Sequence, residues 1–278
     1  MPKLNQFTHD AMDQPRSQSL LQQIVRLNPI RRTISSIGET DSGIRFLNFL
    51  NRKKILFTTF SEAQAVADSL KAKGHEAEFL SDLPLFYPMR TSDYPVLFWL
   101  NRIQPKKLFD VGGSVGNLYY LYQDYLDWKP APDWIVYDLP EIVERGKALA
   151  IERNAQTLSF SIDLAAGKDC DFLLASGSLQ FWEESMASML AGVGSRPRHV
   201  IINRTLLTEQ KSTFVTLQYI GDAALPKMIR NRASLIEEFA DLGYECAGEW
   251  LEPERGLELT LYPAHSVRFF SGLYFRLR

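Results

Sequence analysis

The stretch KLFDVGGSVGNLYYLYQDYLDW, residues 107–128, decides the fold. An apolar strand ends in Asp110, and Gly112, Gly113 and Gly116 follow before a helix rich in tyrosine. A strand, a glycine turn and a helix in this order place backbone N–H groups at the carboxyl edge of a sheet, where doubly wound folds bind ligands. The glycines do not have the G-x-G-x-x-G spacing of a dinucleotide fold. The stretch therefore predicts a turn that binds a different nucleoside-bearing cofactor.

Two acidic residues narrow the choice of cofactor. Asp110 would repel a pyrophosphate but can hold an ammonium group, directly or through water. Asp138 ends the next predicted strand, where a carboxylate can accept both hydroxyls of a ribose. An amino acid joined to a nucleoside without phosphates meets both demands. The sequence thus predicts S-adenosylmethionine as the cofactor.

The rest of the chain predicts an α/β fold in two parts. From residue 104 to 278, β-forming runs at 107–112, 134–139, 158–164, 171–178 and 199–205 alternate with helical segments, which implies a parallel sheet. Two final runs, 245–253 and 267–277, have a short connection, which favours antiparallel pairing. Residues 1–103 are mainly helical in pattern, at 19–28, 42–51, 61–74 and 94–103. We expect this helical extension to form a lid or a dimer interface, and a homodimer is one reading.

Helix boundaries can also be predicted from capping residues. Ser61 with Gln64, and Ser234 with Glu237, have the spacing of a capping box. Gly74 and Gly243 are placed to end the same two helices.

Several motifs resemble a known family. DVGGSVG resembles the first motif of class I S-adenosylmethionine-dependent methyltransferases, with Ser114 where many members carry glycine, and VYDLP is similar to the second motif of the O-methyltransferase branch. Together with LLASGSLQFW, VIINRTLLTE and FSGLYFRL, they resemble a little-characterised bacterial methyltransferase group. The resemblance spans about residue 106 to the end and implies a Rossmann-like, mostly parallel sheet with a reversed C-terminal hairpin. It also implies small-molecule chemistry of secondary metabolism.

The resemblance leaves the reaction open. Some methyltransferase-like relatives cyclise S-adenosylmethionine to azetidine-2-carboxylate and release methylthioadenosine. Methyl transfer to a hydroxyl usually needs a nearby base, and the chain has few candidates. His9 and His75 fall in the extension, and His199 precedes a strand at its far end. His265, in the terminal hairpin, is the one histidine kept as a candidate base. Cyclisation is therefore the leading hypothesis. The alternatives are methyl transfer to a small-molecule hydroxyl or amine, and a non-catalytic module that binds the cofactor.

Candidate site residues cluster after the predicted strands. The expected catalytic residues are Tyr94, Ser176, Gln180, Asn203 and Arg204. The expected cofactor-binding residues are Asp110, Gly112, Gly113, Ser114, Gly116, Asn117, Asp138, Leu139, Asp163, Ser176, Gly177 and Ser178. Three structural alternatives stay open: Ser176 and Ser178 can cap the following helix, Asp163 can be an N-cap, and Tyr119 and Tyr122 can be core residues. Tyr87 and Tyr94 lie in a proline-flanked stretch predicted to be a loop of a lid.

Composition limits the partners. A net charge of −2 argues against nucleic acid as a partner, because phosphate contacts need a clustered excess of Lys and Arg. Cys170 and Cys246 are the only cysteines, and no His, Asp or Glu set has metal-ligand spacing, so we expect no metal. No apolar stretch resembles a signal or a membrane span, which predicts a cytoplasmic protein. A nicotinamide-dependent dehydrogenase is disfavoured by the glycine spacing and by Asp110.

Overall fold

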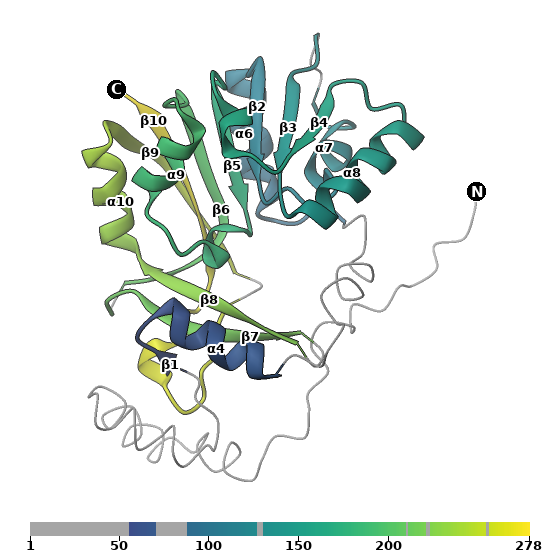
Figure 1. The fold of residues 1–278 in the computed structure, drawn as a ribbon. Helices are drawn as coiled ribbons and strands as arrows, with labels where there is room; N and C mark the ends of the chain where they lie inside the picture. Colours follow the sequence, from purple (N-terminus) through teal and green to yellow (C-terminus); the bar gives the residue numbers. More distant parts are fainter. Residues whose placement is uncertain (1–55, 71–87, 127–129, 210, 221–222, 254–255) are drawn as a thin grey trace, which may run out of the picture.

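The structure is a computed structural model that describes residues 56–70, 88–126, 130–209, 211–220, 223–253 and 256–278 (Figure 1). The helices expected at 19–28 and 42–51, the stop at Gly74, and Tyr87 lie outside these ranges. No helix in the described ranges combines the length and the apolar character needed to cross a membrane.

The centre of the molecule is a parallel sheet. Its strands are β2 (Lys107–Val111), β3 (Asp133–Tyr137), β4 (Leu158–Ser161), β5 (Phe172–Ser176) and β6 (His199–Thr208). They pair in the order β4–β3–β2–β5–β6, so the chain starts in the middle, winds out to β4 and returns to β5. All five strands were predicted from the sequence. The reversal between β2 and β5 creates the topological switch point at which doubly wound folds bind ligands.

The C-terminal strands complete this sheet. β10 (Phe270–Leu277) lies between β6 and β9 (Tyr244–Glu252) and runs antiparallel to both. The expected reversed hairpin is therefore confirmed. A parallel sheet wound in two directions, followed by this reversed strand, is the Rossmann-like methyltransferase sheet expected from the motifs.

Helices cover both faces of the sheet. They are α6 (Asp93–Ile103), α7 (Asn117–Tyr122), α8 (Pro140–Glu152), α9 (Met186–Val193) and α10 (Arg232–Asp241). Alternate strand residues point to opposite sides: Phe109 and Leu173 pack with α9 and α10, whereas Leu108 and Leu174 pack with α6 and α7. Because both faces are covered, the central strands β2 and β5 are mostly apolar. The division at residue 103 remains a proposal, since α6 packs in the same core cluster as β2 and β5.

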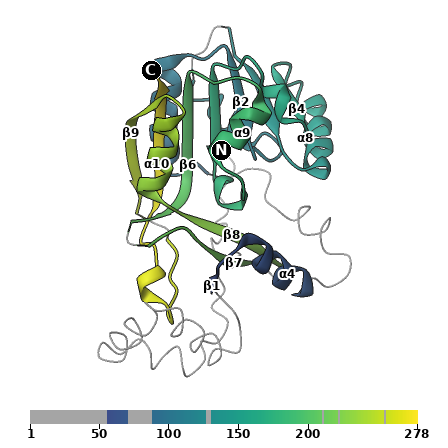
Figure 2. The ribbon, with the colours of Figure 1, turned by 60° about the vertical axis from the view of Figure 1, so that its left-hand side comes forward.

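A second layer lies below the carboxyl edge of the sheet in both ribbon views (Figures 1 and 2). β7 (Phe214–Ile220) and β8 (Ala223–Asn231) form an antiparallel ribbon, and β1 (Leu56–Phe57) pairs with β7. α4 (Phe60–Leu70) packs on one face of the ribbon through Ala63 and Ala67. The sequence patterns had not predicted this ribbon.

Both predicted capping boxes are wrong. α4 begins at Phe60, one residue before Ser61, and Thr59 Oγ1 accepts a hydrogen bond from the backbone N–H of Glu62 at 3.2 Å. α10 begins at Arg232, and the side chain of Asn231 accepts the backbone N–H of Ser234 at 3.0 Å. Thr59 and Asn231, and not Ser61 and Ser234, are therefore the capping residues of these two helices. The stop at Gly243 is confirmed, with φ +89° directly after α10.

Candidate active site

The glycine turn sits at the switch point, between the ends of β2 and β5. Gly112 (φ +73°), Ser114 (φ +56°) and Gly116 (φ +88°) all have left-handed backbone conformations. Ser114 thus occupies a left-handed position of the turn, a conformation that favours glycine. A Cβ on Gly112 would lie 2.4 Å from Cβ of Ser178, so only glycine fits between the two loops. A Cβ on Gly113 would lie 2.5 Å from Oδ2 of Asp110.

Ser178 ties the two loops of the switch point together. Its Oγ donates a hydrogen bond to the carbonyl oxygen of Val111, the last residue of β2. The short 3-10 helix η3 (Leu179–Phe181) follows, and the side chain of Ser178 does not cap it. Ser176 does not cap it either, because its Oγ accepts a hydrogen bond from Nδ2 of Asn203 at 3.1 Å. The capping alternative for these two serines is therefore wrong.

Asp110 is a buried carboxylate directly beneath the turn. Its residue surface is 1 % exposed, and Oδ2 accepts a hydrogen bond from Nε1 of Trp134 at 3.2 Å. Oδ1 has no hydrogen-bond partner. Burial raises the pKa of Asp110 to about 7; the bond from Trp134 lowers it, and the charge of Asp138 raises it further. A buried acceptor with an open lone pair is the group expected to face a ligand ammonium.

Asp138 holds the turn in place. Its Oδ2 accepts the backbone N–H of Ser114 and its Oδ1 that of Leu139, each at 2.8 Å. Each carboxylate oxygen has a second lone pair, so these bonds leave acceptor capacity for ligand hydroxyls. Burial raises the pKa of Asp138, while the two backbone bonds lower it. Asn117 begins α7 at the end of the same turn.

Asp163 and Leu139 flank this edge on the β3–β4 side. Asp163 Oδ1 accepts the backbone N–H of Ala165 at 2.9 Å and caps the 3-10 helix η2 (Leu164–Gly167). Its N-cap role is therefore confirmed, and its contact with an adenine stays a prediction. Leu139 is exposed beside Asp138 and offers apolar surface there.

The predicted catalytic residues have different environments. Asn203 is fully buried and its amide is occupied: Nδ2 donates to Ser176, and Oδ1 accepts from Nε1 of Trp250 at 2.9 Å. Gln180 is buried and donates from Nε2 to the carbonyl of Gly177, while its Oε1 has no partner. Asn203 therefore links three strands, whereas Gln180 keeps an open acceptor near the turn.

Arg204 lies at a break in the β6–β10 ladder. The pairing register shifts between Ser271 and Leu273, and Arg204 has a left-handed φ of +52°. Its guanidinium carbon stands 3.9 Å from where a Cβ of Gly177 would be. The irregularity therefore places a cation beside the loop that follows β5.

Tyr94 was predicted to lie in a loop. It lies instead in the first turn of α6, where it is 60 % exposed. The helix starts here because Oδ2 of Asp93 accepts the backbone N–H of Arg90 at 2.8 Å. The core reading of Tyr119 and Tyr122 is confirmed, since both are buried beneath the sheet. Tyr122 donates its hydroxyl to Oδ1 of Asp93 at 2.9 Å.

The two histidines in the described ranges, His199 and His265, make their contacts away from the glycine turn. His199 starts β6, at the edge opposite the turn, and its Nδ1 pairs with the hydroxyl of Tyr274 at 2.8 Å. His265 is buried in the 3-10 helix η4 (Pro263–His265), edge-on to Phe214. Burial lowers the pKa of both residues. His9 and His75 lie outside the described residues. Among the described residues no group of three His, Cys, Asp or Glu side chains can hold a metal ion.

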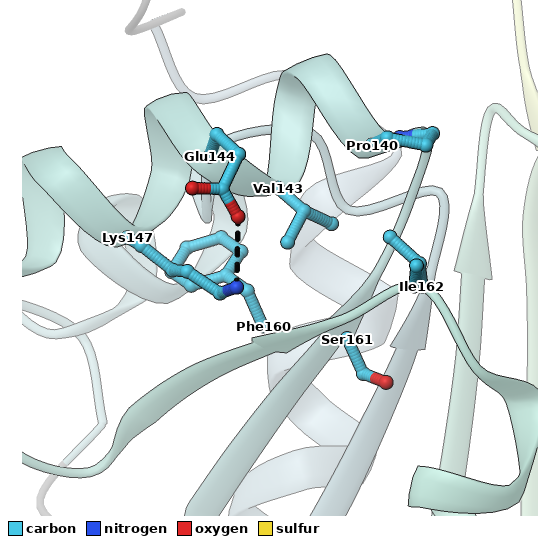
Figure 3. Close-up of a pocket in the computed structure, with 7 residues that line it drawn as sticks. All are labelled: Pro140, Val143, Glu144, Lys147, Phe160, Ser161 and Ile162. Atoms are coloured by element: carbon cyan, nitrogen blue, oxygen red, sulfur yellow. Dashed lines mark hydrogen bonds and ion pairs between the residues drawn. The ribbon is translucent and has the colours of Figure 1, made fainter.

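A hollow of about 250 Å³ lies between α8 and β4 at the outer flank of the sheet (Figure 3). Pro140 and Ile162 stand at one end, and an ion pair between Glu144 and Lys147, 2.9 Å long, stands at the other. Val143 lies between the two ends, and Phe160 also lines the hollow. The apolar end adjoins the loops that carry Asp138 and Asp163.

Comparison with known proteins gives a structural likeness only. No family model matches the chain, and no curated protein matches its sequence. Three solved structures are similar in part. The magnesium protoporphyrin IX methyltransferase of Synechocystis PCC 6803, with bound SAH, is 14 % identical over 77 % of this chain and 99 % of its own, with a TM-score of 0.46.

The other two have TM-scores of 0.48. The glycopeptide N-methyltransferase MtfA, complexed with S-adenosyl-L-methionine, is 9 % identical over 69 % of this chain and 96 % of its own. The 1,6-didemethyltoxoflavin-N1-methyltransferase of Burkholderia thailandensis is 14 % identical over 80 % of this chain and 91 % of its own. Superpositions this loose carry no argument about the reaction, which must come from the topology and the residues.

Two tryptophans complete the site and were not predicted. Trp134 bonds Asp110 from the neighbouring strand, and Trp250 bonds Asn203 from β9. An indole N–H usually finds an acceptor when it is buried, so tryptophans next to polar strand ends were the available signal. Which acceptor each one meets depends on strand order.

Proposed function

We propose that the protein binds S-adenosylmethionine at the glycine turn and transfers its methyl group to a small molecule. The observation that carries the proposal is the open lone pair of Asp110 Oδ1, buried beneath a glycine turn at the switch point. A buried, partly neutralised carboxylate gains stability from a cationic ligand, because the ligand's charge compensates the cost of desolvation. Asp138, with acceptor capacity left on both oxygens, supplies a place for the ribose.

Each predicted residue then has a role in binding or positioning. Asp110 accepts hydrogen bonds from the ammonium group of the cofactor, and Asp138 accepts them from its ribose hydroxyls. Gly112, Gly113 and Gly116 have no side chains, so the cofactor can approach the backbone of the turn closely. Leu139 and Asp163 lie beside the adenine, and Asn117 at the start of α7 follows the turn. Ser176, Gly177 and Ser178 lie beside the methionine end of the cofactor, whose carboxylate Arg204 holds. Gln180 Oε1 accepts a hydrogen bond from the N–H or O–H group of the acceptor. These roles are proposals.

When held by Asp110, Asp138 and the glycine turn, S-adenosylmethionine would supply an electrophilic methyl group on its sulfonium. The residues around it exclude water and fix the direction of attack. The acceptor must lose one proton, and the open oxygen of Gln180 can orient the N–H or O–H that bears it. Tyr94 remains a proposed contact of the acceptor on the basis of its exposed ring.

Cyclisation of the cofactor to azetidine-2-carboxylate is the second candidate. The scarcity of candidate bases in the sequence favoured it. His199 lies at the opposite edge of the sheet, so it does not supply a base at the proposed site. One of its supports is weakened, because Asn203, expected to position the attacking amine, is bound to Ser176 and Trp250. The ribbon at the carboxyl edge instead favours an external acceptor, since it offers a second binding surface.

Mass spectrometry of reaction products distinguishes the candidates. Binding of S-adenosylhomocysteine is measured first, and its failure overturns the proposal. The protein is then incubated with S-adenosylmethionine, alone and with a panel of small hydroxyl and amine acceptors, beside a boiled control. Release of S-adenosylhomocysteine only with an acceptor supports methyl transfer, whereas methylthioadenosine without acceptor establishes cyclisation. Tight binding with neither product indicates a binding module.

A further inference from the structure

Lys227 is a buried cation that the proposed reaction does not use. It lies in β8, is 8 % exposed, and makes no ion pair or hydrogen bond with the described residues. Its Nζ stands over the ring of Phe270, 5.5 Å from the ring centroid. Burial lowers the pKa of Lys227 to about 8, which leaves the ammonium mainly charged at pH 7. A cation–π contact alone does not replace the lost hydration of this charge.

A second unpaired polar group lies beside it. Thr216 of β7 is the register partner of Lys227, and its side chain is 1 % exposed. The Thr216 hydroxyl has no hydrogen-bond partner. Paired residues of antiparallel strands project from the same face with their Cβ atoms about 5 Å apart. An ammonium and an unbonded hydroxyl, both able to donate to a ligand, therefore project from the same face of the ribbon.

These two groups point away from α4, on the face of the ribbon whose Phe214 and Ile229 pack with Leu206 of β6. Val215, Leu217 and Met228, which alternate with them along the ribbon, pack against α4 on the other face. Phe270 begins β10 opposite Leu206, near the carboxyl end of β6. β8 also packs against η3, the helix directly after β5. β7 and β8, which carry Thr216 and Lys227, thus lie below the carboxyl edge of the parallel sheet (Figure 2), the edge at which the glycine turn stands.

We propose that Lys227 and Thr216 bind the carboxylate of the second substrate, a small monocarboxylic acid whose apolar or aromatic body lies by Phe270. The assignment rests on the proposed function, because it gives the methyl acceptor its chemical class. A carboxylate supplies two acceptor oxygens and one negative charge, which match one hydroxyl and one ammonium. A phosphate dianion would leave one charge and further oxygens without donors.

The test compares benzoate with its neutral isostere benzamide. Their dissociation constants are measured by calorimetry on the full chain saturated with S-adenosylhomocysteine, for the wild type, Lys227→Met, Thr216→Val and Lys168→Met. Lys168 is an exposed lysine that precedes the amino end of β5, away from the proposed site. Its replacement is the matched control. Benzoate should bind the wild type roughly tenfold more tightly than benzamide, since a hydrogen bond to a charged group contributes at least that factor.

Lys227→Met should remove the preference for benzoate and leave the affinities for benzamide and S-adenosylhomocysteine unchanged. Thr216→Val should weaken benzoate by a smaller factor, and Lys168→Met should change nothing. Lys227→Met should fold, because it replaces an unpaired buried charge with an apolar chain of similar length. Equal binding of benzoate and benzamide, no binding of benzoate, or an unchanged preference in Lys227→Met would overturn the proposal. If the wild type does not bind S-adenosylhomocysteine, the proposed function is refuted. The benzoate and benzamide affinities of the same protein then still test whether Lys227 and Thr216 bind a carboxylate.

Discussion

At the scale of single residues, the site is built from polar groups that the fold leaves incompletely paired. Asp110 Oδ1, Gln180 Oε1 and the hydroxyl of Thr216 are buried without hydrogen-bond partners. Folded proteins pair nearly all such groups, because each unpaired one costs about 1–3 kcal/mol. Asp110 and Gln180 belong to the proposed cofactor site, where a bound ligand would complete their hydrogen bonding. Asp110 is the most informative, since its protonation connects ligand binding to stability.

Replacing Asp110 with Asn should stabilise the folded protein at neutral pH and weaken cofactor binding. Burial raises the pKa of Asp110 from 3.8 to about 7, so the folded state holds this proton more tightly than the unfolded state. The contribution to stability is therefore complete below about pH 4 and is lost as the pH rises to about 7. Three pKa units correspond to roughly 4 kcal/mol as an upper value. Thermal unfolding from pH 4 to 8 should show a melting-temperature advantage of Asp110→Asn that grows with pH.

The same variant should bind S-adenosylhomocysteine at least tenfold more weakly, because an amide cannot neutralise an ammonium. Asp133→Asn, at the exposed start of β3, is the matched control and should leave both the melting temperature and the affinity close to wild type. An advantage of Asp110→Asn that did not change with pH would contradict the role assigned to burial. An unchanged affinity would remove Asp110 from the cofactor site.

At the scale of elements, the strand, glycine turn and helix at 107–122 are predictable because each residue type has a local cause. Apolar β-formers give β2, and φ values of +73° and +88° require glycine at 112 and 116. Close approach adds a second constraint that the sequence does not show. Gly112 faces Ser178, which is 66 residues later in the chain.

Gly112→Ala and Gly194→Ala separate backbone strain from close approach. Gly194 ends α9 at φ +74° with no atom within 4 Å of an added Cβ, so its replacement carries the strain alone, about 1 kcal/mol. Gly112→Ala adds a contact of 2.4 Å with Ser178 and should cost about 1–3 kcal/mol more. Urea unfolding measures both, and calorimetry should find S-adenosylhomocysteine binding lost only in Gly112→Ala. Equal costs, or intact binding in Gly112→Ala, would show that the two loops can separate freely.

The ribbon β7–β8 marks the limit of prediction from the sequence. Its first run, FVTLQYI, has β-forming residues, but Pro226 interrupts the second run, and proline argues against a central strand. The structure accommodates Pro226 because β6 pairs with β8 only at Arg230 and Asn231. Likewise, the acids and glycines of the turn were predictable from local pattern. The contacts made by Trp134, Trp250 and Lys227 were not predictable, because burial and contact partners follow from the strand order.

At the scale of the whole molecule, the two proposed binding surfaces come from segments that are distant in sequence. The cofactor edge comes from residues 107–181, within the parallel sheet. The surface opposite comes from the ribbon at 214–231, supported from behind by α4 at 60–70. Among the described residues, the ribbon pairs with the main sheet at two positions, Leu207 with Arg230 and Thr208 with Asn231. A layer held by so few ladder positions can open without unfolding the sheet.

Disturbing the packing of α4 should therefore loosen the ribbon alone. Ala63 is fully buried against β7 and β8, whereas Ala65, on the same helix, is exposed. Ala63→Leu overpacks this contact and should cost about 1–3 kcal/mol, while Ala65→Leu should cost almost nothing. Hydrogen exchange should speed up in β7 and β8 of Ala63→Leu and stay unchanged in β2 and β5. Benzoate affinity should fall in that variant while S-adenosylhomocysteine affinity does not. If exchange accelerated equally in β2 and β5, the two layers would unfold as one unit, and the ribbon could not move separately from the cofactor edge.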